Sequence, residues 1–416
     1  MDFTKNRIIL NLPSFYITVA HSVERGFSRL SIHQNSMESS DNRKDIKRKK
    51  FSIEDSDVGT LEEIQSEYQE ILRSVISISN EETSGKNKHG QQNPKTVLFS
   101  EVTVEDDKII CGHSNDQVKI LDPERLVEVQ LDTKSNLTCR HNGLSGVRCS
   151  RVNPAIFYTS SSKEGSIFQW DQRMTSFKPV QKYVIKSDAG FACGTKAILS
   201  FDVSLNDQVI CGGTELADED SYVLFWDIRS TRLLGAYWES HSDDITTVNF
   251  SPVNGNKLAT GSTDGLLNIF DLRESTEDDA LLFSFNSESS VDAVCWETGD
   301  LVAKFDREKV ANSYKRSRKE AAYLQGSYRI DQKGSLGILV SSLAGNCARI
   351  VKLEENSLSP FCLFSDQVSL VQSATRFHKS NRWFTFDEGG ESKIWEPVPS
   401  QSTLKASQPK KSKKSK

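Results

Sequence analysis

The chain has 416 residues, of which 36% are hydrophobic, and it carries 52 Lys and Arg against 57 Asp and Glu. The net charge of −5 disfavours a protein that binds polyanions over its whole surface. No apolar stretch approaches the ~18 residues that a membrane span needs, and Asn11 and Pro13 interrupt the first apolar run. We therefore expect a soluble, intracellular protein with a globular core and polar segments attached to it.

The first 95 residues are predicted to form a largely disordered extension. Residues 34–59 are almost entirely polar and include a basic run over 43–50, so they cannot bury enough apolar area to fold. Thr60 begins a helix-capping pattern that ends at Glu63, and apolar residues follow at helical spacing. This pattern predicts one amphipathic helix over 60–77, which packs against the main domain or in a groove of a partner.

From residue 96 onward the pattern consists of short alternating runs that end at Gly, Asp or Asn, which is typical of an all-β domain. One unit recurs with spacings of 49, 56 and 44 residues, ending at Asp122, Asp171, Asp227 and Asp271. These spacings start at the ~40–45 residues of a four-stranded propeller blade and increase where loops are inserted. Two copies end in a Trp-Asp dipeptide, at 170–171 and 226–227.

These repeats resemble the WD40 family, and the resemblance covers residues 96–398. It implies an all-β propeller of seven blades, with the extension 1–95 before it and a disordered Lys-rich tail over 399–416. The blades are predicted over 96–132, 133–182, 183–238, 239–287, 288–320, 321–361 and 362–398. Closing the ring requires a strand from one terminus, and either Arg7–Leu12 or Phe15–Ala20 could supply it.

The fifth blade departs from the family pattern. After the strand-like run 291–296, the chain passes directly to Phe305-Asp306-Arg307 and a basic stretch over 309–319. About twenty residues of the blade are missing in comparison with the resembled family. Either the blade is incomplete, or the sequence derives from a gene model or splice form that skips part of it. An open ring would expose strand edges.

The resemblance further implies a hydrogen-bonded network within each blade. A His before the first strand, a Ser or Thr on the second, an acid in the following turn and the Trp of the dipeptide take part. In the fourth copy these are His241, Thr260 and Asp264, with Phe270 at the Trp position. In the second copy they are His141, Ser160, Glu164 and Trp170, and the His-to-acid separation is 23 in both copies. Recurrence in every repeat favours a structural role over a hydrolase triad.

Residues that differ between copies are the candidates for partner binding, because propellers work as rigid platforms whose loops bind other proteins. Acidic residues cluster in the third repeat and at the start of the fourth: Glu215, Asp218, Glu219, Asp220, Asp243 and Asp244. They predict a negative part of the rim that suits a basic peptide or protein. Solvated loops without a partner are the alternative.

An Arg lies two positions after the final Asp in three of the copies: Arg173 and Arg229 follow the two Trp-Asp dipeptides, and Arg273 follows Phe270-Asp271. This pattern resembles the WDxR box of substrate receptors that dock on the adaptor of cullin-4 ubiquitin ligases. The resemblance implies that one of these guanidinium groups reaches the adaptor as a charged hydrogen-bond donor. Many unrelated WD40 proteins have an exposed Arg at this position.

The sequence shows no metal constellation, no phosphate-binding loop and no unique pair of nucleophile and base, so we expect no enzyme, no cofactor and no small-molecule substrate. The eight cysteines form no CxxC pair and are interpreted as reduced, buried strand residues. Six lysines and no acid lie over 405–416, which favours a nuclear or nucleolar location, with at most weak contact to nucleic acid. The leading hypothesis is a non-catalytic scaffold for protein partners, and the alternative is a ligase substrate receptor.

Overall fold

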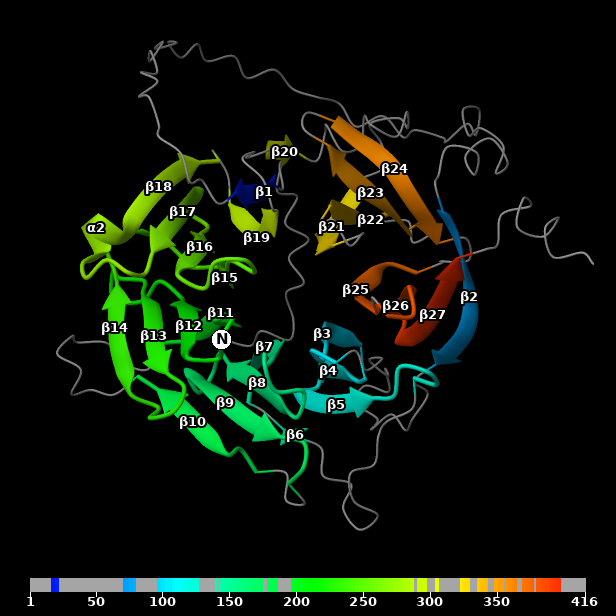
Figure 1. The fold of residues 1–416 in the computed structure, drawn as a ribbon, viewed down its shortest axis with the longest axis horizontal. Coiled ribbons are helices and arrows are strands. Elements are labelled where there is room, and N and C mark those ends of the chain that lie inside the picture. Colours follow the sequence, from blue (N-terminus) through cyan, green and yellow to red (C-terminus); the bar gives the residue numbers. More distant parts are fainter. Residues whose placement is uncertain are drawn as a thin grey trace, which may run out of the picture.

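The computed structural model describes residues 16–21, 70–79, 96–105, 107–126, 139–140, 142–174, 178–185, 196–287, 290–297, 304–306, 322–329, 335–342, 348–354, 357–364, 369–377 and 379–397. The described strands form six sheets, of which one has eight strands. That sheet consists of two four-stranded blades, so seven blades follow one another around a ring (Figure 1). The predicted all-β propeller is confirmed.

Each of the first four blades consists of consecutive antiparallel strands, and the first of them lies nearest the ring centre (Figure 1). Blade 1 has β3 (Val97–Val102), β4 (Ile109–His113), β5 (Gln117–Leu121) and β6 (Cys139–Arg140). Blade 2 has β7 (Leu144–Cys149), β8 (Ile156–Ser161), β9 (Ser166–Asp171) and β10 (Gln181–Val184). Blade 3 has β11 (Ile198–Val203), β12 (Val209–Thr214), β13 (Val223–Asp227) and β14 (Leu233–Tyr237). Blade 4 has β15 (Thr247–Phe250), β16 (Lys257–Gly261), β17 (Leu266–Asp271) and β18 (Leu281–Asn286), which the short helix α2 (Glu277–Ala280) precedes.

The last three blades include two strands from the N-terminal part of the chain. Blade 5 has β19 (Val291–Glu297), β1 (Tyr16–His21) and β20 (Lys304–Asp306). Blade 6 has β21 (Ala322–Arg329), β22 (Leu336–Ser342), β23 (Ala348–Glu354) and β24 (Ser357–Phe364). Blade 7 has β25 (Val371–Phe377), β26 (Arg382–Asp387), β27 (Glu391–Pro397) and β2 (Glu70–Ser79).

The strand β2 completes blade 7, and this result corrects two predictions. The helix predicted over 60–77 is wrong from residue 70 onward, because β2 is a strand there, while residues 60–69 lie outside the described residues. Of the two predicted closing runs, residues 16–20 pair in blade 5 and not with the last blade, and residues 7–12 lie outside the described residues. Instead β2 is antiparallel to β27 and parallel to the outer strand β24 of blade 6, so it joins the two sheets. Between the open edges of β24 and β27, a strand can form backbone hydrogen bonds on both of its sides, which favours a strand over a solvated helix.

The fifth blade is incomplete among the described residues, as predicted, and it takes a strand from elsewhere. The strand β1, which overlaps the predicted run Phe15–Ala20, lies between β19 and β20. It occupies the position of the second strand of a blade. Its pairing with β20 is antiparallel, as in the other blades, but its pairing with β19 is parallel. The Phe305-Asp306 pair that imitates a dipeptide ends β20.

The blade boundaries differ from the prediction by a few residues. Strand β6 at 139–140 closes blade 1, although the second blade was predicted to begin at 133, and β24 continues to 364. Several predicted features lie outside the described residues: the polar segment 34–59, the basic stretch 309–319 and the Lys-rich tail. The nuclear location inferred from that tail stays a prediction. Among the described residues, no helix has the length and apolar character required to cross a membrane.

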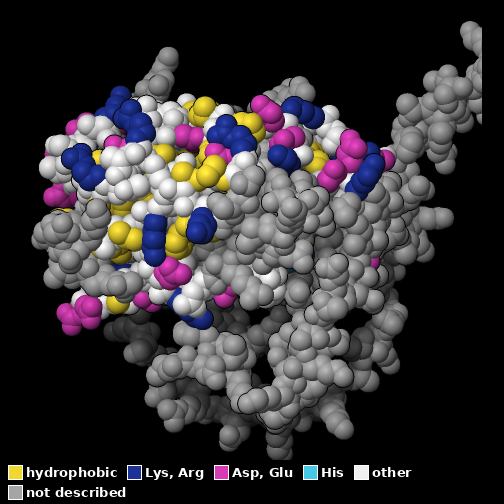
Figure 2. Space-filling view, turned by 90° about the horizontal axis from the view of Figure 1, so that it is seen from below, with side chains coloured by type: hydrophobic (Ala, Val, Ile, Leu, Met, Phe, Trp, Pro, Cys, Tyr) yellow, Lys and Arg dark blue, Asp and Glu magenta, His cyan; other side chains and the backbone are white. Residues whose placement is uncertain are grey.

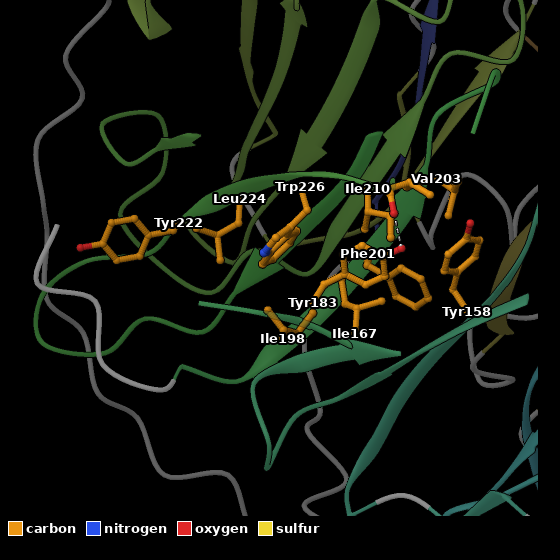
Figure 3. Close-up of a cluster of buried hydrophobic side chains, with 11 residues drawn as sticks. Tyr158, Ile167, Tyr183, Ile198, Phe201, Val203, Ile210, Tyr222, Leu224 and Trp226 are labelled. Atoms are coloured by element: carbon orange, nitrogen blue, oxygen red, sulfur yellow. Dashed lines mark hydrogen bonds between the residues drawn. The ribbon is translucent and has the colours of Figure 1, made fainter. Parts of the chain in front are cut away.

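The hydrophobic core is distributed between blades rather than gathered at one centre. Figure 3 shows the cluster between blades 2 and 3, where Trp226 and Leu224 lie against Ile167 and Tyr183. Similar clusters join blades 7 and 1, 1 and 2, 3 and 4, 4 and 5, and 6 and 7. Both faces of a blade are therefore buried, which explains why strands such as β4 and β16 are buried at every position.

Polar side chains on the innermost strands join one blade to the next. The hydroxyl groups of Ser145 and Ser200 donate to the carbonyl oxygens of Ile198 and Ile245, at distances of 2.7 and 2.9 Å. Two residues beyond Ser200 on β11, the buried carboxylate of Asp202 accepts the backbone N–H of Phe250 on β15, at 2.8 Å. Hydrogen bonds therefore accompany the apolar contacts at successive blade interfaces.

The closing strand generates the first prediction. Leu72 of β2 is paired with Phe364 of β24 and with Pro397 of β27, so its N–H points toward one of these strands. We expect Leu72→Pro to lower the free energy of unfolding by about 1–3 kcal/mol, because proline removes a donor within the sheet. Urea denaturation of the full chain measures this loss. Leu72→Val is the control, since it keeps the N–H and suits a strand; equal losses in both variants would contradict the pairing.

Candidate protein-interaction surface

Blade 4 contains the predicted hydrogen-bonded network. His241 is buried, with Nδ1 at 3.1 Å from Oδ2 of Asp264 and Nε2 at 2.7 Å from Oγ1 of Thr260. The carboxylate of Asp264 also accepts the backbone N–H groups of Ser242 and Leu266. Burial raises the pKa of Asp264, but the hydrogen bonds from His241 and the two amides outweigh it, and the pKa lies below its ordinary value. These contacts confirm the network in this copy.

Blade 2 follows the pattern with a different register, which corrects two assignments. The indole N–H of Trp170 donates to Thr159 at 2.8 Å, not to Ser160. Ser160 contacts the hydroxyl of Ser145, because adjacent strand residues point to opposite faces of the sheet. Glu164 forms an ion pair with Lys182 at 2.9 Å, and His141 lies outside the described residues.

The reason for this error is one additional residue in the hairpin of blade 2. Trp170 and Phe270 are paired with Phe157 and Leu258, so the hydroxyl two residues later is on Thr159 or Thr260 respectively. From that hydroxyl the chain takes five residues to Glu164 but four to Asp264. The shared His-to-acid separation of 23 therefore did not determine the position of the hydroxyl.

Other blades retain only parts of the network. In blade 7, the indole N–H of Trp395 donates to Thr385 at 2.8 Å, which repeats the Trp170–Thr159 contact. The sequence reading missed this copy, although Trp395-Glu396 differs from a Trp-Asp dipeptide by one acid. In blade 3, Gly212 occupies the hydroxyl position, and the Trp226 N–H donates across the interface to the carbonyl of Val184 at 3.1 Å.

The predicted partner-binding residues lie at opposite ends of the strands. Because successive strands are antiparallel, the β12–β13 hairpin and the loop before β15 lie on one face of the ring, together with His241. The three Arg residues follow the third strands of blades 2, 3 and 4 and lie on the other face. About 20 Å separates the two faces, the length of a six-residue strand such as β17. The acidic and the basic candidates therefore form two separate surfaces.

The acidic candidates converge between blades 3 and 4. The carboxylate of Asp244 accepts the backbone N–H of Leu216 at 2.8 Å, and Glu215 accepts that of Ala197 at 2.8 Å. These two carboxylates hold the β12–β13 hairpin in place. The tip of this hairpin has three successive acidic residues with exposed side chains: Asp218, Glu219 and Asp220. Asp243 accepts the N–H of its neighbour and is half-buried.

The backbone of this hairpin tip has an unusual conformation. Asp218 and Glu219 have φ angles of 55° and 70°, in the left-handed region that costs an ordinary residue about 1–2 kcal/mol. Lys196 stabilises the turn from below: its side chain is buried, and its ammonium donates to the carbonyls of Ala217 and Asp220. The same group lies 5.0 Å from the centre of the Tyr222 ring. The Tyr222 hydroxyl also donates to the carboxylate of Asp220 at 3.2 Å, so the tip is held in one conformation.

The three Arg residues differ in how firmly the protein holds them. Arg173 and Arg273 fold back on Asp171 and Asp271, with two guanidinium nitrogens on each carboxylate. Hydrogen bonds from these Arg side chains lower the pKa of both carboxyl groups. Arg229 is held more loosely: its nearest contact to Asp227 is 3.9 Å, and its side chain is 82% exposed.

The outer edge of the ring has a mixed character. Figure 2 looks at the edge on which β9 and β10 lie and shows basic and acidic side chains intermixed, with apolar side chains between them. On the described part of this edge no charge of one sign dominates. The hairpin tip at 218–220, with three adjacent acids, differs from it.

Comparisons with known proteins agree with this geometry. No family model matches the chain. An uncharacterized WD repeat-containing protein of Schizosaccharomyces pombe is 29% identical over 193 residues, which cover 44% of this chain and 53% of that protein. The WD repeat-containing protein 89 homolog of Dictyostelium discoideum is 31% identical over 91 residues, 22% of this chain and 24% of that protein. The chain is thus similar to several WD repeat-containing proteins, and its ring of four-stranded sheets agrees with a WD40 propeller.

A third relative is the histone acetyltransferase type B subunit 2 of Candida albicans, which is 34% identical over 170 residues, 37% of this chain and 43% of that protein. The chain thus matches about half or less of the length of these relatives. Similarity to WD repeat-containing proteins supports a general role as a protein-interaction scaffold.

The described part of the chain shows no group of three or more His, Cys, Asp or Glu residues that could hold a metal ion. Its described thiols are buried and reduced, at Cys111, Cys149, Cys211 and Cys362. Burial raises the pKa of Cys149 and Cys211 well above the usual value, so these thiols stay protonated and unreactive. The interpretation of these four cysteines as buried strand residues is confirmed.

The network of blade 4 generates the second prediction. We expect His241→Ala to lower the free energy of unfolding by about 2–3 kcal/mol, because Thr260 and Asp264 lose a buried hydrogen-bond partner. Denaturant unfolding measures the loss, and the exposed neighbour substitution Ser242→Ala is the control. A melting temperature unchanged from that of the unsubstituted protein would disprove the structural role.

This loss also depends on pH. The pKa of Asp264 is lowered on folding, so the carboxylate stabilises the fold above its unfolded pKa of about 3.9, and this contribution disappears as the pH falls through the lower folded value. The difference in free energy of unfolding between the unsubstituted protein and His241→Ala should therefore become smaller below about pH 4.

Proposed function

We propose that this chain is a non-catalytic WD-repeat scaffold that binds a basic segment of a partner protein on the face that carries the acidic hairpin tip. The supporting observation is the arrangement of Asp218, Glu219 and Asp220, which are exposed on a turn held by Lys196 from inside. A turn that is already ordered loses little conformational entropy on binding. Three adjacent carboxylates attract Lys and Arg side chains and accelerate their approach.

The comparisons support assembly with other proteins in general terms. One relative is, by its name, a subunit of a histone acetyltransferase and therefore part of a larger enzyme. A similar role for this chain means that the propeller positions a partner and contributes no reacting group. The buried position of His241 and its contacts within blade 4 support the same conclusion, because these groups serve the fold.

The third prediction tests the acidic face. We expect the triple substitution Asp218→Asn, Glu219→Gln, Asp220→Asn to lower the recovery of a basic partner several-fold, since the attraction is lost. Tagged purification of both forms with quantitative mass spectrometry measures it, and raising the salt concentration should reproduce the loss for the unsubstituted chain. The control neutralises exposed acids of other blades: Glu105→Gln, Glu124→Gln and Glu388→Gln. An identical set of partners for both triple variants would contradict the proposal.

A second candidate function is that of a cullin-4 ligase substrate receptor, and the geometry of Arg229 favours it over the other two Arg residues. The carboxylate of Asp227 accepts hydrogen bonds from the backbone N–H of Arg229 and from the hydroxyl and backbone N–H of Ser230, and these bonds lower the pKa of Asp227. The carboxylate is therefore occupied by groups other than the guanidinium, and Arg229 extends into solvent. Arg173 and Arg273 would have to break a paired contact with their own Asp before they reached an adaptor.

The fourth prediction separates the two functions. If the chain is a ligase receptor, the adaptor should co-purify with it, and Arg229→Ala should abolish this recovery. Arg173→Ala is the matched control and should leave it unchanged, because that side chain is committed to Asp171. Absence of the adaptor from purifications that still recover a basic partner would eliminate the receptor function and retain the scaffold.

A further inference from the structure

The outer strand of blade 4 exposes an apolar surface that the acidic face does not include. Leu282 and Phe283 of β18 are 52% and 38% exposed, and Leu281 beside them is also exposed. In the described sheets β18 is the last strand of its blade, so one of its backbone edges is open. Three successive exposed apolar residues on an open edge form a surface on which another strand could pair.

The same blade position elsewhere in this molecule already has an added strand. In β18, Phe270 is paired with Leu281 and Ile269 with Phe283, so Leu282 is an extra residue in a bulge. In β24 of blade 6, the corresponding extra residue is Phe361, between Pro360 and Cys362. The two outer strands therefore have the same local geometry. Residues 283–285 of β18 correspond to residues 362–364 of β24.

Those three residues of β24 are the ones that pair with β2. Cys362, Leu363 and Phe364 lie opposite residues 70–72 in a parallel arrangement, and all three are buried. In β18, the equivalent Phe283 and Ser284 are exposed and Phe285 is half-buried. Blade 6 thus shows a parallel strand paired at this position, where Cys362 and Phe364 also pack against blade 7. Blade 4 has the same bulge with Phe283 and Ser284 still in contact with solvent.

We propose that β18 binds an extended segment of a partner protein, which pairs in parallel with residues 283–285 as β2 pairs with β24. Backbone hydrogen bonds supply the pairing, and alternate apolar side chains of the segment cover Leu282 and Phe283. This surface lies on the outer edge of the ring and is distinct from the acidic hairpin tip, so the proposal does not depend on the proposed function.

Charge determines the chemistry of the segment. The exposed acids Glu274, Asp278 and Asp279 lie in and before α2, immediately ahead of β18. The nearest base along the chain, Arg273, is paired with Asp271. In a parallel pair the N-terminal end of the added strand lies beside the start of β18, so Lys or Arg residues should precede its apolar run.

The same argument distinguishes this occupant from a second copy of the chain. A second β18 in parallel would place its own acids beside those of the first, and like charges repel. The outer strand β14 of blade 3 has an equivalent bulge at Leu234, but the residues after it are Gly235 and Ala236, which offer little apolar area. Of β14, β18 and β24, the described outer strands with this bulge, β18 combines an open edge with apolar side chains after the bulge.

The fifth prediction tests the strand addition. A phage-displayed library of random 12-residue peptides is selected on the purified full chain and counter-selected on Leu282→Lys. We expect enriched peptides with Lys or Arg before alternating apolar residues, and their affinity, measured by fluorescence anisotropy, should fall at least about tenfold for Leu282→Lys. Val253→Lys is the matched control, because Val253 is as exposed as Leu282 but lies in the loop between β15 and β16 of the same blade.

Two further measurements complete the test. Methylating alternate backbone amides of an enriched peptide should weaken binding at least about tenfold, since strand pairing needs these donors. Replacing Asp278 and Asp279 with Lys should weaken basic peptides without altering the strand. The proposal is overturned if no enriched peptide depends on Leu282 or if the methylated peptide binds equally well. It is also overturned if the full chain sediments as a dimer that Leu282→Lys dissociates.

Discussion

Burial of both faces of each blade is the interaction on which the rest of this structure depends. A four-stranded blade has two apolar faces, and it can cover them only with the blades on either side. The clusters around Trp226 and Trp395, among others, lie between blades, so each interface stabilises two sheets at once. Hydrogen bonds such as Ser145 to Ile198 accompany these contacts along the innermost strands. A missing strand in one blade therefore weakens its neighbours as well.

This dependence explains the use of the N-terminal part of the chain. In the described part of blade 5, its own segment supplies β19 and β20, and β1 fills the position between them. Blade 7 lacks its own outer strand, and β2 supplies it while also pairing with β24. Both inserted strands run parallel to one neighbour, an arrangement that hairpin-connected strands do not produce. Strands far apart in sequence thus satisfy edges that would otherwise be open.

The surfaces suited to partners are the places where the repeats differ. The buried His241 network and the Trp170–Thr159 contact serve the fold, and similar contacts recur in other blades. By contrast, the left-handed turn at Asp218 and Glu219, the loosely held Arg229 and the exposed apolar edge of β18 each occur in one blade of the described residues. Their strain, solvation or exposure is not needed to pack the ring. WD40 scaffolds bind through such local additions to a common frame.

The sequence by itself determined the all-β fold and the repeat period, because hairpin patterns and Trp-Asp dipeptides are local signals, and the resemblance to WD40 repeats implied the seven blades. It also located the acidic hairpin and the three Arg residues. Tertiary structure decided that 70–79 is a strand, since a capping pattern cannot compete with two open sheet edges. It likewise assigned the Trp170 partner to Thr159, because strand pairing and not spacing along the chain decides which side chains meet.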